Sequence, residues 1–313
     1  MSTCSSCQRQ ASSPQQSLLL AASKLPHIEP CLYPPPTPEF FGRTFVAQNR
    51  PGHFPNLVSP ASSYAWPASV KWSERDGGSL EETLRGMLRS DAAREAIVKV
   101  ELAKFGRGYN DEGKGWDLIR MPFGTFIESF ICQSLPWSPT SERLVGYVAQ
   151  QPLADLGQEL EADCPSLPHV KQGAKGGGED WGRNLWVGGA EAHSIKGTFT
   201  PIHRDPYHNL FVQVVGHKRI HFFPPEAADL LHLNRTGTQT NTSRVASEAA
   251  LLDGIPKDCT ETDSLSLAQA THKHALKAAH VVLEPGDALY IPQGWFHCVA
   301  SLSTSASVNS WFR

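Results

Sequence analysis

Residues 197–225 read GTFTPIHRDPYHNLFVQVVGHKRIHFFPP, and this stretch decides the fold. Its β-branched and aromatic residues gather in three short runs, at 197–203, 210–215 and 219–223. Runs of this kind, separated by Gly, Pro and Asp, predict β-strands rather than helices. Gly216-His217, between the second and third runs, predicts the turn of a β-hairpin.

Signals for further short elements lie on both sides of this stretch. The other strands that we expect are 98–102, 184–188, 281–291 and 297–312. Pro285-Gly286-Asp287 predicts a turn inside the third of these. Apolar residues at helical spacing predict helices over 79–97 and 122–132. Helices followed by many short strands predict a mainly β protein, a double-stranded β-helix (a cupin-like jelly roll) with a helical N-terminal cover.

Composition divides the chain into a leader and one domain. Residues 1–38 are rich in Ser, Gln and Pro and bury too little apolar surface to fold, so we expect a flexible leader. Residues 39–313 have the composition and length of one globular domain. Within it, residues 226–280 are polar and mixed, which predicts an insertion with helical pieces. The Gly-rich segment 173–178 lacks the ending of a phosphate-binding loop and predicts a solvent loop.

Bulk composition narrows the class of function. The formal net charge is −3, which gives no sign of a large basic surface, so nucleic-acid binding is not expected. No apolar run approaches the length of a membrane helix. Seven cysteines without framework spacing indicate reduced thiols, as in a cytoplasmic or nuclear protein.

His203-Arg204-Asp205 is a candidate metal-binding pair. Residues two apart in a strand point to the same face, so the imidazole and the carboxylate can hold one ion together. His297, on a late strand after the turn at 292–294, is a candidate third ligand. Two histidines and one carboxylate leave three coordination positions open, as in the facial triad of non-haem Fe(II) oxygenases. The chain has 13 histidines, so ordinary polar strand residues are the alternative, and manganese or zinc can bind the same ligands.

Lys218 adds a second kind of candidate. It opens the strand after the predicted hairpin turn, and we expect that strand to lie beside the strand of the His-x-Asp pair. A lysine that faces into a barrel is costly unless an anion meets it. A dicarboxylate that chelates the metal through a 2-oxo acid would place its far carboxylate deeper, within reach of Lys218. The alternative is a solvent-facing lysine at a hairpin tip.

The segments 197–225 and 283–312 (LEPGDALYIPQGWFHCVASLSTSASVNSWF) resemble the jumonji-C (JmjC) family. The similarity is greatest to the small protein hydroxylases that include the lysine-specific demethylase 8 (arginyl hydroxylase) group. Upstream, residues 146–150 (GYVAQ) and 184–188 (NLWVG) resemble that group's Tyr-Leu-Ala-Gln and Asn-x-Trp-x-Gly motifs. The resemblance implies Fe(II) as the metal, 2-oxoglutarate as cosubstrate and O₂ as oxidant.

The resemblance also implies roles for individual residues. It implies iron ligands at His203, Asp205 and His297. It implies that the distal carboxylate of 2-oxoglutarate meets Lys218, Thr200 and Tyr147. Amides near the cosubstrate and metal are implied at Asn209 and Asn309. Residues that line the substrate pocket are implied at Glu101, Trp186 and Tyr109.

The implied activity is hydroxylation of a protein or peptide side chain. The family's small hydroxylases carry His-x-Asp, whereas many histone-demethylating members carry Glu, which favours hydroxylation over demethylation. A carboxylate at Glu101 favours an arginine substrate, because it can accept two hydrogen bonds from one guanidinium. Lysine demethylation, hydroxylation of a tRNA base and a non-catalytic cupin-like binding module remain alternatives. We expect a monomer, because nothing corresponds to the C-terminal dimerisation helices of the related asparaginyl hydroxylase.

Overall fold

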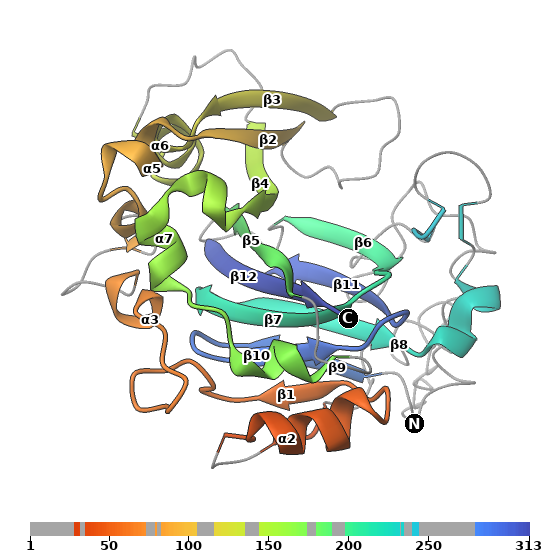
Figure 1. Cartoon of the computed structure of the whole chain (residues 1–313). Coiled ribbons are helices and arrows are strands. Elements are labelled where there is room, and N and C mark those ends of the chain that lie inside the picture. Colours follow the sequence, from red (N-terminus) through yellow and green to blue (C-terminus); the bar gives the residue numbers. More distant parts are fainter. Residues whose placement is uncertain are drawn as a thin grey trace, which may run out of the picture.

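Two antiparallel β-sheets face each other in the computed structural model (Figure 1). The structure describes residues 28–31, 35–72, 79, 83–104, 116–134, 144–173, 180–189, 198–231, 233–234, 240–243 and 279–313. The eight-stranded sheet has the order β1 (Gly52–Phe54), β10 (Ala288–Ile291), β7 (His208–Val215), β12 (Ser305–Phe312), β5 (Asp180–Gly188), β4 (Leu144–Pro152), β2 (Ile97–Lys104) and β3 (Trp116–Pro122). The four-stranded sheet has the order β6 (Phe199–Arg204), β11 (Phe296–Ser301), β8 (Lys218–Phe223) and β9 (Ala279–Leu283). This is the predicted jelly roll.

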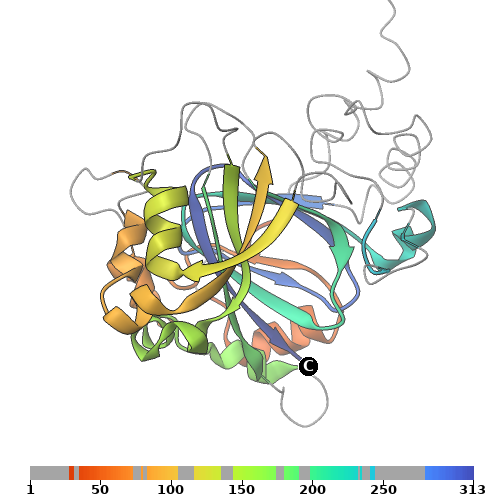
Figure 2. The same cartoon turned by 90° about the horizontal axis from the view of Figure 1, so that it is seen from above.

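Short helices cover the barrel, most of them on one side, with η6 on the opposite side (Figure 2). They are α2 (Pro38–Phe41), η1 (Gly42–Val46), α3 (Ala68–Lys71), η2 (Arg85–Met87), α5 (Asp91–Glu95), α6 (Phe123–Phe126), η3 (Ile127–Ile131), η4 (Leu153–Leu156), α7 (Gln158–Asp163), η5 (Pro168–Gln172) and η6 (Pro225–Leu230). All but η6 precede β5 in sequence, which confirms the helical N-terminal cover. Among the described residues no helix is both long and apolar enough to span a membrane.

The strands β7 and β10 of the eight-stranded sheet are buried on both faces, which gives the protein two cores. Its outer face packs against the helices in the larger core, to which β7 contributes Val212 and Val214. Its inner face meets the four-stranded sheet in a smaller core, to which β7 contributes Phe211. Alternation along one strand therefore separates the two cores, because successive strand residues point to opposite faces.

The predicted hairpin at Gly216-His217 is wrong. β7 and β8 lie in different sheets, so the chain crosses from one sheet to the other at this turn. Gly216 adopts a φ of 68°, and the buried side-chain amide of Gln213 donates to the carbonyl oxygens of Val215 and Gly216, at 2.7 Å and 3.0 Å. The two-residue turn signal is the same for a hairpin and for a crossover, so only the sheet pairing separates them.

Two other predicted elements are divided in the structure. Residues 297–312 form β11 and β12 in different sheets, and the chain crosses between the sheets at 302–304. Residues 79–97 are not one helix: α5 begins after Ser90, whose hydroxyl accepts from the N–H of Ala93, and residue 97 opens β2. Gly86 in η2 lies against the backbone of Lys71, where a Cβ atom would be 2.7 Å from the carbonyl oxygen. This close contact accompanies the break in the helix.

The end of the predicted leader packs on the domain. The N–H of Ile28 donates to the carbonyl oxygen of His280 at 2.9 Å, and that of Cys31 to His53 at 2.8 Å. Residues 1–27, 32–34 and 174–179 lie outside the described residues. So does most of the predicted insertion, at 232, 235–239 and 244–278. The described part of the insertion includes η6, a helical piece as predicted.

Gly216→Ala should destabilise the protein more than Gly182→Ala. Both glycines have positive φ, 68° and 107°, so both substitutions carry the backbone cost of roughly 1–2 kcal/mol. Only at Gly216 would the new Cβ overlap the carbonyl oxygen of Thr304, whereas nothing lies within 4 Å at Gly182. Urea unfolding of the two variants measures the difference, and equal losses would show that the crossover has room to relax.

Candidate metal centre

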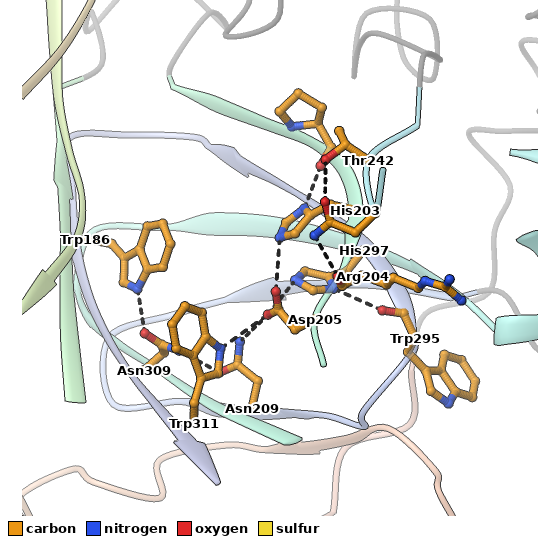
Figure 3. A network of polar contacts seen from close by, with 12 residues as sticks. Trp186, His203, Arg204, Asp205, Asn209, Thr242, Trp295, His297, Asn309 and Trp311 are labelled. Carbon is orange, nitrogen blue, oxygen red and sulfur yellow. Dashed lines mark hydrogen bonds and ion pairs between the residues drawn. The ribbon is translucent and has the colours of Figure 1, made fainter. Parts of the chain in front are cut away.

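The pairing of β6 with β11 brings two histidines together. His203 and His297 are direct partners in the antiparallel register, and their ring centroids lie 4.3 Å apart. Asp205 follows the end of β6, with Oδ1 3.9 Å from Nε2 of His203 and Oδ2 3.8 Å from Nε2 of His297 (Figure 3). One ligand atom from each residue lies within 4.8 Å of the others. The structure thus assembles the three residues that the sequence singled out.

Backbone carbonyls orient both imidazoles. Nδ1 of His203 lies 2.8 Å from the carbonyl oxygen of Pro201, and Nδ1 of His297 lies 3.3 Å from that of Trp295. Because a carbonyl oxygen only accepts, each Nδ1 carries the proton and donates it. Each Nε2 is then left with its lone pair directed toward Asp205. Burial, and next the neighbouring His203, lower the pKa of His297, which favours the neutral form that binds metals.

Asp205 is held through one of its two carboxylate oxygens. Oδ2 accepts from Nε1 of Trp311 at 3.3 Å and from Nδ2 of Asn209 at 3.5 Å. The N–H of Gly294 also donates to the Asp205 backbone carbonyl at 3.0 Å, which ties the residue to the predicted turn at 292–294. In the described part of the chain both side-chain donors fall on Oδ2, so Oδ1 is left to meet an ion.

Trp311 is the residue at this site that sequence reasoning missed. It lies two residues beyond Asn309 on β12, so both point to the same face of the sheet. The two-residue spacing was visible in the sequence, but it predicts that Trp311 faces the site only when Asn309 is known to face inward. Asn309 is fully buried and donates from Nδ2 to Oδ1 of Asn209 at 3.2 Å.

Lys218 is fully buried inside the barrel, and its ammonium has no hydrogen-bond acceptor among the described residues. Its nearest charge-stabilising neighbours are the rings of Phe211 and Tyr147, with centroids 5.4 Å and 5.8 Å from Nζ. Burial lowers the pKa of Lys218 to about 7. A buried cation without a counter-anion is unfavourable, so this pocket fits an anionic group such as a carboxylate. A solvent-facing lysine at a hairpin tip is therefore excluded.

The strand of Lys218 does not lie beside the strand of the His-x-Asp pair, as the sequence led us to expect. β11 separates β8 from β6. The ammonium nevertheless faces the same interior, because Lys218 lies on the same face of β8 as Ile220 and Phe222, which belong to the inner core.

The hydroxyl groups of Thr200 and Tyr147 lie on the same side of the barrel as Lys218. Thr200 is three residues from His203, a spacing that would normally put the two side chains on opposite faces. A register shift lets His203 pair with His297 and Thr200 with Val299, which are two residues apart on β11. Thr200 hydrogen-bonds the phenol of Tyr147, whose pKa is raised by burial and then by the charge of Glu101.

The candidate substrate residues lie along the same face. Glu101 is the direct cross-strand partner of Tyr147 on the β2–β4 pair, and the Trp186 ring lies 6.4 Å from that of Tyr147. Tyr109 lies outside the described residues. The structure thus brings Glu101, Tyr147 and Trp186 together beside the pocket of Lys218.

The fold and the site define a class. A double-stranded β-helix whose inner face brings two histidines together beside one carboxylate is a barrel of the cupin type with a candidate metal site.

Comparison with known proteins agrees with this class. The family model described as "Cupin-like domain" matches residues 37–313. "Lysine-specific demethylase JMJ30" of Arabidopsis thaliana is 32% identical over 259 residues, 82% of this chain and 49% of its own. "Lysine-specific demethylase 8" of Danio rerio is 32% identical over 208 residues, 66% of this chain and 44% of its own. The chain spans about half the length of these curated relatives.

A third relative matches over most of both chains. The human "Bifunctional peptidase and (3S)-lysyl hydroxylase JMJD7" is 29% identical over 304 residues, 92% of this chain and 85% of its own. The chain therefore belongs to the cupin-like domain family, in its JmjC branch.

Lys218→Met should stabilise the protein at neutral pH. The folded-state pKa of about 7 lies below the unfolded value of about 10.4, so the unfolded chain binds more protons between these pH values. Wild-type stability should therefore rise with pH across this window, and the substitution removes a cost of roughly 2–4 kcal/mol at pH 7.

Thermal unfolding at pH 7 and pH 9.5 measures this effect, and the advantage of the Met variant should shrink at the higher pH. Lys99→Met, at an exposed position of β2, is the matched control and should leave the Tm unchanged. A Met variant that melts below the wild type at pH 7 would show that Lys218 already has a compensating partner.

Proposed function

We propose that this chain is an Fe(II)- and 2-oxoglutarate-dependent oxygenase that hydroxylates a protein side chain, with arginine as the favoured residue. The observation that carries the proposal is the buried ammonium of Lys218 on the same interior as the two histidines and Asp205. A metal triad alone fits many cupin-type proteins. A triad that shares the barrel interior with a buried cation that has no acceptor among the described residues suits a ligand with a metal-binding end and a carboxylate end.

The ligand residues suit iron. His203 and His297 would each offer Nε2 and Asp205 would offer Oδ1, a donor set typical of non-haem Fe(II) sites. When bound, Fe(II) and 2-oxoglutarate supply the activation of O₂ that puts one oxygen atom into a substrate C–H bond, with succinate and CO₂ as co-products. The carbonyls of Pro201 and Trp295 hold the two ring protons on Nδ1, and Trp311 holds Oδ2 of Asp205.

The cosubstrate carboxylate would be met by Lys218 and by the hydroxyl groups of Thr200 and Tyr147. A carboxylate beside Lys218 would keep the ammonium charged at neutral pH, because an opposite charge offsets the burial that lowers its pKa. Lys218 is fully buried, and the ring of Phe211 from the inner core lies 5.4 Å from its ammonium, so water is excluded from this group. The same exclusion strengthens the ion pair.

A cationic side chain suits the neighbouring surface formed by Glu101, Tyr147 and Trp186. Glu101 lies opposite Tyr147, and Trp186 lies beside it, so a carboxylate and two aromatic rings line one surface. A guanidinium can bind such a carboxylate through two hydrogen bonds and stack on the rings. Lysine is the second candidate, because relatives are named as a lysyl hydroxylase and as lysine-specific demethylases. Arginine and lysine side chains are both cations, which distinguishes these two candidate substrates from a tRNA base.

The cellular location and the oligomeric state of the protein are also part of the proposal. We propose a cytoplasmic or nuclear protein, for which the support is that the cysteines of the described residues, Cys31, Cys132, Cys164 and Cys298, form no disulfide bonds. The monomeric state stays a prediction, which light scattering on the purified protein tests.

The activity is tested with Fe(II), 2-oxoglutarate, ascorbate and a set of arginine- and lysine-containing peptides. We expect succinate formation and a peptide mass gain of one oxygen atom. Loss of one methylene would mean demethylation of a methylated peptide. Asp205→Ala and His297→Ala should each lower turnover by at least about 100-fold, because each removes a ligand. His217→Ala, at an exposed turn, is the control and should keep full activity. No succinate and no bound metal in the wild type would favour a binding module.

Glu101→Gln should weaken peptide use without affecting the metal or the cosubstrate. The change keeps the size of the side chain but removes the charge, which should raise the peptide KM about tenfold or more. The Kd values for Mn(II) and 2-oxoglutarate should stay near those of the wild type. Asp117→Asn, at an exposed position of neighbouring β3, is the control. Unchanged peptide KM in Glu101→Gln would remove Glu101 from the substrate pocket.

A further inference from the structure

Three hydrogen bonds in series connect the substrate wall to the metal site (Figure 3). Nε1 of Trp186 donates to Oδ1 of Asn309 at 2.7 Å, and Nδ2 of Asn309 donates to Oδ1 of Asn209 at 3.2 Å. Nδ2 of Asn209 then donates to Oδ2 of Asp205 at 3.5 Å. We call Trp186, Asn309, Asn209 and Asp205 the amide relay.

All three hydrogen bonds of the amide relay run the same way, from the donor Trp186 to the acceptor Asp205. An indole N–H can only donate, and an ionised carboxylate can only accept. Trp186 therefore fixes Oδ1 of Asn309 toward itself, and Asp205 fixes Nδ2 of Asn209 toward itself. If either amide turned over, two oxygens or two NH₂ groups would face each other. The orientation of both amides thus follows from their neighbours.

Burial makes this order costly to break. Asn309 is fully buried and Asn209 is 5% exposed, so a broken link would leave a polar group without a partner inside the protein. The relay is also carried by rigid elements, because its residues lie on the neighbouring strands β5, β12 and β7 and just beyond β6. A shift at the Trp186 end is therefore passed across paired strands as far as Asn209, whose side chain reaches Asp205 in the crossing from β6 to β7.

The two ends of the relay face different ligands. Trp186 is half-buried beside Tyr147, on the wall where we place the substrate. Asp205 lies between the two histidines. The link from Asn209 to Asp205 is the longest of the three, so it has the most to gain from tightening.

We propose that Trp186 is a positioning residue for the metal site, and that the amide relay couples contact at the substrate wall to the orientation of Asp205. A side chain that packs on the Trp186 ring fixes the indole, and the ordered amides then hold Oδ2 of Asp205. The coupling is reciprocal, so metal binding also orders the Trp186 wall. The proposal rests on the proposed metal role of Asp205.

Trp311 limits the size of the effect. It donates to the same Oδ2 at 3.3 Å and takes no part in the relay. Loss of the relay should therefore weaken metal binding without abolishing it. The expected change is that of one hydrogen bond, about three- to tenfold in the Kd.

The test uses the full chain and Mn(II) as probe, with titration calorimetry for the Kd and electron paramagnetic resonance for the geometry of the bound ion. Trp186→Phe keeps an aromatic ring but loses the N–H, and should weaken Mn(II) binding about three- to tenfold and change the resonance line shape. Asn209→Ala removes the last link. The Kd of the double variant should equal that of Asn209→Ala alone, because Trp186 acts through Asn209.

Trp72→Phe is the control for a merely structural effect. It removes an indole N–H that donates to Asp163 at 2.9 Å in the helical cover. This variant should have a lower Tm but an unchanged Mn(II) Kd and line shape. The relay is refuted if the losses of Trp186→Phe and Asn209→Ala add up in the double variant, or if Trp186→Phe binds Mn(II) like the wild type. A wild type that binds no Mn(II) would instead overturn the proposed function, and the relay with it.

Discussion

The register between β6 and β11 is the constraint on which the site depends. It sets His203 opposite His297 on the inner face, and the shift between His297 and Val299 brings Thr200 to the same face. Because strand side chains alternate, a slip of one residue would turn these side chains out of the barrel. The apolar pattern of β11, with Phe296, Cys298 and Ala300 buried on the other face, works against such a slip. Core packing and metal geometry therefore specify the same register.

Two separate cores allow the interior to be polar. The larger core, between the eight-stranded sheet and the helices, contains most of the buried apolar residues. The smaller core between the sheets contributes less, and shares its space with Lys218, Asn209, Asn309 and the metal-site residues. Burying an uncompensated ammonium costs stability. The helical cover can offset that cost because its packing does not depend on what the barrel contains.

Sequence reasoning identified the residues of the candidate site better than the connections between strands. His203, Asp205 and Lys218 were identifiable because the His-x-Asp spacing puts two possible ligands on one strand face and because the segments around them resemble the JmjC family. The hairpin at Gly216 was wrong, because turn residues report a local change of direction and not which strands pair. Trp311 was missed for a related reason: its role depends on a hydrogen bond to Asp205, which is 106 positions away. Contacts of this kind follow from sheet order, which a single sequence does not contain.

The two sheets contribute different residues to the candidate site. The four-stranded sheet carries both histidines and Lys218, which meet the metal and the cosubstrate under our proposal. The eight-stranded sheet carries Glu101, Tyr147 and Trp186, which under the same proposal form the wall for the substrate. Asp205 belongs to neither sheet, because it lies in the short crossing from β6 to β7. Its position thus depends on both sheets at once, and the hydrogen bonds from Trp311 and Asn209 reach it from the eight-stranded sheet. A change in how the sheets pack would therefore alter the position of the Asp205 carboxylate. Under our proposals, substrate binding and metal binding can affect each other through this group.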